Sequence, residues 1–227
     1  MFDFLGPGDT LSQLGEDLAD TFSRSLAKVA PDVNVIDRMQ VRAVIEKNRV
    51  APTVVRDSEI SWWLAHELKA QSLIVGQLSP ADGGKVHLVI SVATVQSGKD
   101  FENFSVDIPI TPEMKDHFAK TVWSATRSRV PPPGTTISKY PVCRRCPSPQ
   151  FSEAAMTNHQ EGVVVLVAQV GVDGTLRNID FVNGVQYGLT QRAIVAVQSW
   201  KLDPAKDTKG RPIELAHRIE VHFQMKH

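Results

Sequence analysis

The two cysteines of the chain lie three positions apart, as Cys143-Arg144-Arg145-Cys146, and this spacing suits three kinds of chemistry. A zinc site takes four ligands, and the sequence holds no second CxxC motif or close histidine pair. A thioredoxin-like redox pair opens a helix after a strand, whereas Pro141 and Pro147 flank these cysteines. A local disulfide that closes a loop in an oxidising compartment is favoured over both. We therefore predict a Cys143–Cys146 disulfide without a metal.

Histidines are the other side chains that could bind a metal or transfer a proton. His66-Glu67 lacks the second histidine of the HExxH zinc-protease motif. His217 falls on the apolar face of the last predicted strand, where we expect a hydrogen-bonded interior or interface histidine. His222 and His227 are expected to face solvent. Since the signatures GxxxxGK(S/T), GxGxxG and GxSxG are also missing from the sequence, it predicts a binding protein without catalytic residues, metal or cofactor.

The composition is that of a globular protein with balanced charge. The 227 residues are 42% hydrophobic, which is too much for a disordered chain. Because the chain has 25 basic and 25 acidic side chains, no surplus of positive charge is available for the phosphates of nucleic acid. The longest apolar run, residues 163–172, is shorter than the ~20 residues that cross a bilayer. No signal peptide is recognised at the start of the sequence.

The N-terminal half, residues 1–128, is predicted to alternate helices and strands. Apolar residues recur at helical spacing from Leu11 to Val29. Asp37, Asp57 or Ser58, and Thr111 are predicted helix caps, since each precedes a helical pattern. This order predicts an α/β domain on a mixed sheet. Short β-branched or alternating segments predict its strands at residues 33–36, 72–78, 86–95 and 104–110.

A proline-rich segment, Val130–Thr136, separates the two halves of the chain. Consecutive prolines resist both helix and sheet, so we place a linker at residues 129–146, which include the CxxC motif. Each half is expected to fold by itself, and a protease is expected to cleave between Val130 and Ser138.

The C-terminal half, residues 147–227, has the pattern of an α+β domain. The predicted order of its elements is two strands, a helix and a strand. An apolar run at residues 162–172 is joined by the turn Asp173-Gly174 to a second strand at 176–182. A helix with apolar residues on one face follows and ends after Trp200. Apolar and polar residues then alternate from Ile213 to Met225, which is typical of a strand with one buried face.

Several motifs of this half resemble the TonB C-terminal domain family in order and spacing, over roughly residues 147–225. The Trp-x-x-x-Pro-Ala sequence at the helix exit, from Trp200 to Ala205, is the most distinctive of them. The sequence departs from the family at Phe151-Ser152, where Tyr-Pro is usual. The resemblance implies a small TonB-like β-β-α-β domain. The matching segments are Pro149–Ala155, Glu161-Gly162, Val172–Gly174, Ala193–Val197, Ser199–Ala205 and Gly210–Ile213.

The N-terminal half is similar to the N-terminal domain of TolB and to CsgG/FlgO-like envelope domains over roughly residues 1–120. The similarity rests on Val35–Arg38, Ala65 with Leu68–Ala70, and Leu73–Leu78. It implies a protein of the cell envelope, as the TonB resemblance does.

Together, the resemblances imply a periplasmic interaction module that pairs with an extended peptide of an outer-membrane transporter and transduces energy. An edge strand offers unpaired N–H and C=O groups to such a peptide, and the last predicted strand is the candidate edge. The candidate peptide-binding residues are Gln150, Phe151, Leu215, His217, Ile219, Glu220, Val221 and Phe223.

Three questions stay open at this point. The last strand could lie inside the sheet or pair with a second copy of the chain in a homodimer. The protein could also be a scaffold for envelope assembly or secretion that uses a TonB-like fold without energy transduction. The full-length protein could carry a membrane or lipid anchor.

Overall fold

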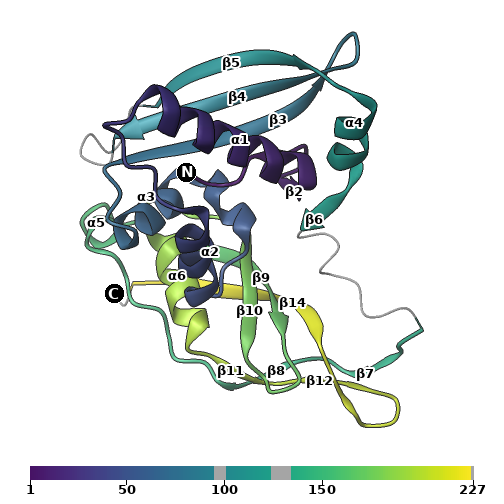
Figure 1. Cartoon of the computed structure of the whole chain (residues 1–227). Coiled ribbons are helices and arrows are strands. Elements are labelled where there is room, and N and C mark those ends of the chain that lie inside the picture. The colour runs from purple at the N-terminus through teal and green to yellow at the C-terminus, as the bar shows by residue number, and fades with distance from the viewer. Residues whose placement is uncertain (95–100, 124–133, 226–227) are drawn as a thin grey trace. The chain divides into compact units, whose positions relative to one another are not determined.

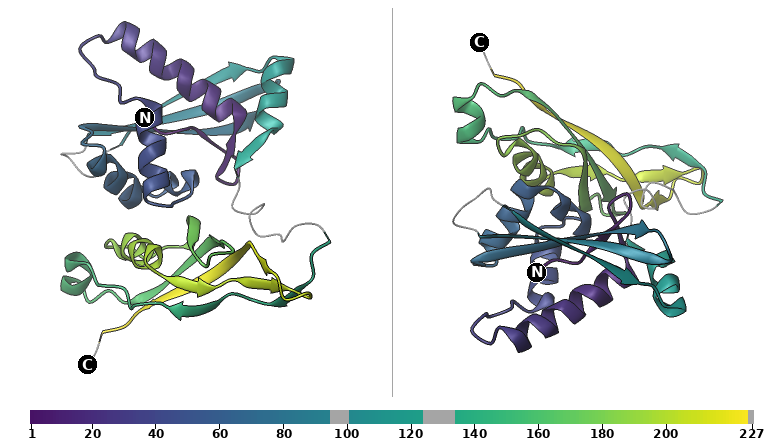
Figure 2. Two further views of the ribbon diagram at one scale, coloured as in Figure 1. Left: turned by 60° about the horizontal axis from the view of Figure 1, so that its bottom comes forward. Right: turned by 90° about the horizontal axis from the view of Figure 1, so that it is seen from above.

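The computed structural model of the chain describes residues 1–94, 101–123 and 134–225 (Figures 1 and 2). Its contacts divide the chain into two compact units. Unit 1 comprises Met1–Ile45 and Val55–Ser124, and unit 2 comprises Glu46–Val54 and Ala125–His227. Most of the proline-rich segment lies outside the described residues, and the predicted boundary at residues 129–146 stays a prediction. The short piece Glu46–Val54 was not expected in unit 2.

Unit 1 is built on a six-stranded sheet with the order β5-β4-β3-β1-β2-β6. β1 pairs with β3 in parallel and the other neighbours are antiparallel, so the predicted mixed sheet is confirmed. The helix α2 and the 3-10 helix η1 lie where the chain passes between the units. The elements are β1 (Leu5–Gly6), β2 (Thr10–Ser12), α1 (Gln13–Val29), α2 (Arg38–Lys47), η1 (Pro52–Arg56), α3 (Ser58–Glu67), β3 (Ser72–Ala81), β4 (Lys85–Thr94), β5 (Glu102–Pro109), α4 (Pro112–Ala119) and β6 (Thr121–Trp123).

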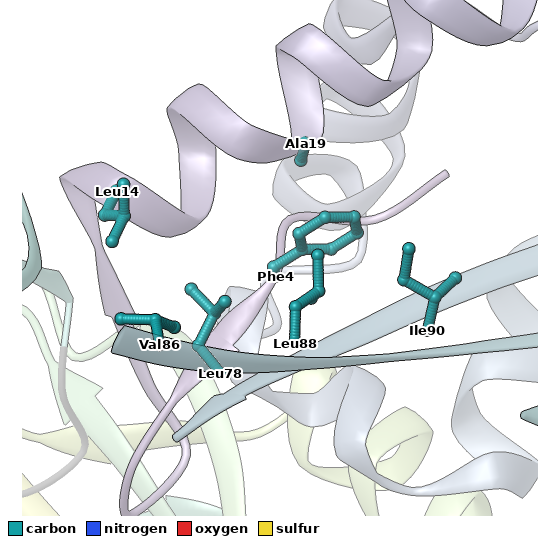
Figure 3. Close-up of a cluster of buried hydrophobic side chains, with 7 residues drawn as sticks. All are labelled: Phe4, Leu14, Ala19, Leu78, Val86, Leu88 and Ile90. Carbon is teal, nitrogen blue, oxygen red and sulfur yellow. The ribbon is translucent and has the colours of Figure 1, made fainter. Parts of the chain in front are cut away.

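The core of unit 1 forms where α1 packs on one face of this sheet, with Phe4 at its centre (Figure 3). Phe4 is fully buried and meets Phe22 of α1 edge to face, with ring centroids 6.2 Å apart. Gly76 of β3 leaves room for the Phe4 ring, because a Cβ atom there would lie 2.2 Å from Phe4 Cδ1. The cluster comprises Phe4, Leu14, Ala19, Leu78, Val86, Leu88 and Ile90.

The predicted helix caps of unit 1 are confirmed. The carboxylate of Asp37 accepts a hydrogen bond from the N–H of Met39 at 2.6 Å. Asp57 caps α3 through the N–H of Ile60 at 3.0 Å, and Thr111 caps α4. These side chains satisfy N–H groups that the helix itself leaves unpaired.

Residues 33–36 are not a strand, contrary to the sequence prediction. The reason is that the strand β3 already has two neighbours, β4 on one side and β1 on the other. The N–H of Phe2 also bonds to the carbonyl of Ile74, which extends the pairing beside β3. Helix α1 begins at Gln13, two residues later than the helical pattern from Leu11 predicts, since Thr10–Ser12 pairs with β1.

Unit 2 contains a three-stranded antiparallel sheet with the order β10-β9-β14 (Figure 1). The predicted sequence of two strands, a helix and a strand is confirmed by β9, β10, α6 and β14. The shorter elements around it were not predicted. The elements are β7 (Ile137–Lys139), β8 (Val142–Arg145), α5 (Glu153–Thr157), β9 (Gly162–Val170), β10 (Leu176–Asn183), α6 (Leu189–Gln198), β11 (Lys201–Asp203), β12 (Ala205–Asp207), β13 (Pro212–Ile213) and β14 (Leu215–Phe223).

We expect Gly76→Ala to lower the free energy of unfolding of unit 1 by about 1–3 kcal/mol, because the added methyl group overlaps the Phe4 ring. Chemical denaturation followed by circular dichroism measures the loss. Combining Gly76→Ala with Phe4→Leu is expected to cost less than the sum of the two single changes, since the smaller side chain relieves the overlap. Strictly additive losses would contradict this account.

Candidate functional site

The strand β14 lies at one edge of the unit 2 sheet. It pairs with β9 along its whole length, from Leu215 opposite Val170 to Phe223 opposite Gly162. In the part of the chain that the structure describes, no strand pairs with the other side of β14. That side therefore presents main-chain donors and acceptors that an additional strand could use.

The side chains of β14 divide into a buried and an exposed set. Glu220 is exposed, as are Arg218 and His222, and His217 is half-buried on the inner side of the strand. The four predicted apolar site residues contribute side chains to the core, so only their main chain is left for a peptide. These four residues are Leu215, Ile219, Val221 and Phe223.

Phe151 lies against the C-terminal end of β14. Its ring meets the buried ring of Phe223 edge to face, with a centroid distance of 5.3 Å and an interplanar angle of 82°. Phe151 itself is half-buried, and the neighbouring Gln150 is exposed. The structure thus brings Phe151 to the strand, as the sequence predicts, and a packed aromatic pair joins the two segments.

Ser152 holds in place the segment that leads into unit 2's main sheet, residues 147–152, called the entry segment below. The sequence analysis missed this role. Its Oγ atom accepts a hydrogen bond from the N–H of Ala155 at 3.0 Å and so caps α5. The same hydroxyl donates to the carbonyl of Tyr187, next to the start of α6. The pattern serine followed by Glu153 is a helix-start signal and could have revealed the cap.

The surroundings of His217 favour one of its protonation states. Burial lowers the pKa of His217 below its ordinary value of 6.5, because the charged imidazolium is poorly solvated there. The neutral ring is therefore favoured in the folded protein.

The Trp-x-x-x-Pro-Ala motif is structural. The indole N–H of Trp200 donates to the carbonyl of Pro147 at 2.9 Å, which ties the start of the entry segment to the end of α6. The N–H of Leu202 donates to the carbonyl of Gly174 at 3.0 Å. Gly174 has a φ of +72°, and a Cβ atom there would lie 1.9 Å from the Leu202 carbonyl oxygen, so only glycine fits this turn.

Cys143 and Cys146 are joined by a disulfide, as predicted. Cys143 lies in β8 and Cys146 directly follows it; because β8 pairs with β11, the bond lies beside the segment that contains the Trp200 motif. In the ranges that the structure describes, no cluster of three or more metal-binding side chains occurs and no helix is long and apolar enough to cross a membrane.

Comparison with known protein families matches the C-terminal part of the chain. Residues 147–225 match the family model of the Gram-negative bacterial TonB protein C-terminal. The predicted resemblance to the TonB C-terminal domain is thereby confirmed for this part of the chain. The match does not extend to residues 1–146, so the TolB-like resemblance of the N-terminal half stays a prediction.

Three solved structures also match parts of the chain. The LpoB C-terminal domain from Salmonella enterica is 13% identical with a TM-score of 0.38, and covers 48% of this chain and 78% of its own. The LpoB structure from E. coli is 13% identical with a TM-score of 0.39. The match covers 48% of this chain and 53% of the LpoB chain. The TonB C-terminal domain from Pseudomonas aeruginosa is 18% identical with a TM-score of 0.33. The match covers 40% of this chain and 91% of the Pseudomonas domain. The comparison with curated proteins returned no match.

Reduction of the disulfide is expected to lower the free energy of unfolding of unit 2 by no more than about 2 kcal/mol, because the bond closes a very short loop. Thermal unfolding with and without a reducing agent measures this. The double variant Cys143→Ser/Cys146→Ser is the control and should not respond to the reductant. A complete loss of folding on reduction would contradict the prediction.

Lowering the pH from 7.5 to 5.5 is expected to destabilise unit 2 through His217. The pKa of His217 in the folded state is depressed below 6.5, so the unfolded state binds more protons as the pH falls. Denaturation midpoints across this range test the effect. His217→Gln should remove part of the pH dependence and His222→Gln should keep it. An unchanged dependence in His217→Gln would disprove the assignment.

Proposed function

We propose that this protein is a periplasmic, non-catalytic interaction module that binds an extended segment of an envelope protein by strand addition to β14. The observation that carries the proposal is the sheet order β10-β9-β14, which leaves the outer side of β14 unpaired among the described strands. The TonB C-terminal match supports a protein-interaction module of the envelope.

Main-chain pairing would supply much of the affinity. In an antiparallel pair, alternate residues direct their N–H and C=O groups toward the neighbouring strand, so about half of the nine residues of β14 face outward. Each hydrogen bond with an added strand contributes about 0.5–1.5 kcal/mol. A segment of a few residues could therefore bind with useful affinity while the core of unit 2 stays unchanged.

Selectivity would come from the exposed side chains of β14. Arg218 and Glu220 form an ion pair of 3.2 Å, and His222 lies 3.9 Å from Glu220. Side chains directly opposite or diagonal across neighbouring strands interact, so a bound segment would place its own residues beside these charges. A segment with both an acidic and a basic residue matches this row.

A peptide of an outer-membrane transporter is the ligand that the TonB match favours, and energy transduction is the corresponding role. A scaffold for envelope assembly is the second candidate. It is supported by unit 1, which has a sheet and a core of its own and could hold a second partner. Both roles use the β14 edge in the same way.

Glu220→Pro is expected to weaken peptide binding by about tenfold or more without unfolding the protein. Proline removes one main-chain donor and places a ring on the edge, and it is tolerated on an edge strand where the N–H faces outward. Glu220→Gln keeps the donor and should bind almost normally. Titration calorimetry with a peptide from a co-encoded outer-membrane receptor measures the affinity, and circular dichroism monitors folding.

His217→Pro tests the residues of β14 whose N–H groups point the other way, because the N–H of His217 is directed opposite to that of Glu220. His217→Pro should therefore disturb pairing with β9, whereas Glu220→Pro should affect only binding. If both variants unfold, β14 is an interior strand and the binding mechanism is wrong. If both stay folded and bind normally, the peptide binds elsewhere.

A further inference from the structure

The opposite edge of the same sheet, at β10, is occupied by the segment Asn48–Val54. The main chain of Val50 pairs in parallel with Ile179 of β10. The N–H of Ala51 donates to the carbonyl of Ile179 at 2.9 Å, and the N–H of Ile179 donates to the carbonyl of Arg49 at 2.9 Å. Both main-chain groups of Ile179 are therefore used by a segment that lies more than a hundred positions earlier in the chain.

A bulge in β10 makes these groups available. The register with β9 jumps between Arg177 and Asp180, so Asn178 and Ile179 have no paired partner in β9. Asn178 adopts a φ of +47°, a left-handed conformation that asparagine tolerates better than most residues. Bulges of this kind redirect the backbone, and here the bulge turns Ile179 toward the segment.

Several side chains of the segment are buried. Val50 is 2% exposed, and Ala51 and Val54 are completely buried. Thr53 is 1% exposed, and its hydroxyl donates to the carboxylate of Asp180, itself 2% exposed, at 2.9 Å. A buried carboxylate needs such donors, so this bond selects a hydroxyl at one position of the segment.

The end of α6 completes the surface. The side-chain amide of Gln198 donates to the carbonyl of Asn48 at 2.6 Å, and the guanidinium of Arg49 donates to the carbonyl of Gln198 at 3.2 Å. Main-chain hydrogen bonds and a buried polar pair thus hold the segment, whose apolar side chains are buried. Strand addition between separate proteins uses the same kinds of interaction.

We infer that the β10 edge of unit 2 is a second strand-addition surface, specific for an extended segment with small aliphatic side chains and a hydroxyl, and that this chain fills it with its own residues Asn48–Val54. All residues of the surface itself lie within the part that matches the TonB C-terminal family, whereas the segment lies outside it. This surface is separate from β14, and the inference does not depend on peptide binding there.

The test uses the full chain and a fluorescent peptide of residues Glu46–Arg56. The wild-type chain should bind the peptide weakly, because its own segment competes for the same surface. Thr53→Val weakens the chain's own segment and leaves the surface intact. The Thr53→Val chain should therefore bind the peptide about tenfold more tightly than the wild-type chain in fluorescence anisotropy, whereas Thr53→Ser, which keeps the hydroxyl, should behave like the wild type.

Changes in the peptide itself test recognition without affecting the fold of the protein. A peptide that carries Thr53→Val or Ala51→Pro should bind the Thr53→Val chain about tenfold more weakly than the natural peptide, because it lacks the hydroxyl or the N–H that pairs with Ile179. Equal binding of the natural and altered peptides would overturn the inference.

Thermal unfolding covers the case in which Thr53→Val lowers stability. The natural peptide should raise the melting temperature of this variant and leave that of the wild-type chain almost unchanged, since a ligand stabilises the state that binds it. A Thr53→Val chain that neither binds the peptide nor is stabilised by it would show that residues 48–54 are ordinary interior packing, and the inference would fail.

Discussion

The main chain of β9 is the constraint on which unit 2 depends. This strand is buried over most of its length and pairs on one side with β10 and on the other with β14. Buried N–H and C=O groups must find partners, so both neighbours are required. A three-stranded sheet of this kind has two edges, and the two differ in whether another segment pairs with them. The chain pairs its own residues with the β10 edge at Ile179, and it leaves the β14 edge unpaired in the described part of the structure.

This difference between the edges explains how one small sheet can avoid indiscriminate association. An unpaired edge is a template for any extended chain, and proteins protect edges by covering them or by placing charges beside them. At β10 the cover is the segment Asn48–Val54. At β14 the exposed polar side chains of Arg218, Glu220 and His222 lie next to the edge. If a partner binds by strand addition, as proposed, β14 is the side open to it, and the neighbouring polar side chains would select partners of suitable charge.

Local patterns in the sequence predict much of the fold. The alternation from Ile213 to Met225 predicts β14 because its two faces meet different environments, and Asp37, Asp57 and Thr111 predict helix starts because capping is a local interaction. The family resemblance predicts that Phe151 lies beside the last strand, and its ring contacts Phe223 at the end of β14.

The rest depends on pairing between distant segments, which leaves little trace in local patterns. Residues 33–36 have the composition of a strand, yet β3 already has two neighbours. Conversely, Val50 and Ala51 have no strand pattern and gain their pairing from a bulge at Asn178 in a distant part of the chain. The buried pair Thr53–Asp180 joins two polar residues that the sequence alone gives no reason to connect.

The segment Asn48–Val54 also determines when unit 2 can finish folding during synthesis. Thr53 and Asp180 are 127 positions apart, and a ribosome adds about 5–20 residues per second. Thr53 is therefore made about 6–25 s before its partner exists. During that interval Val50 has no β10 to pair with, and the apolar side chains of the segment are exposed to other chains unless a chaperone binds them. Completion of unit 2 is thus a late event, which must wait for two segments that are synthesised far apart in time.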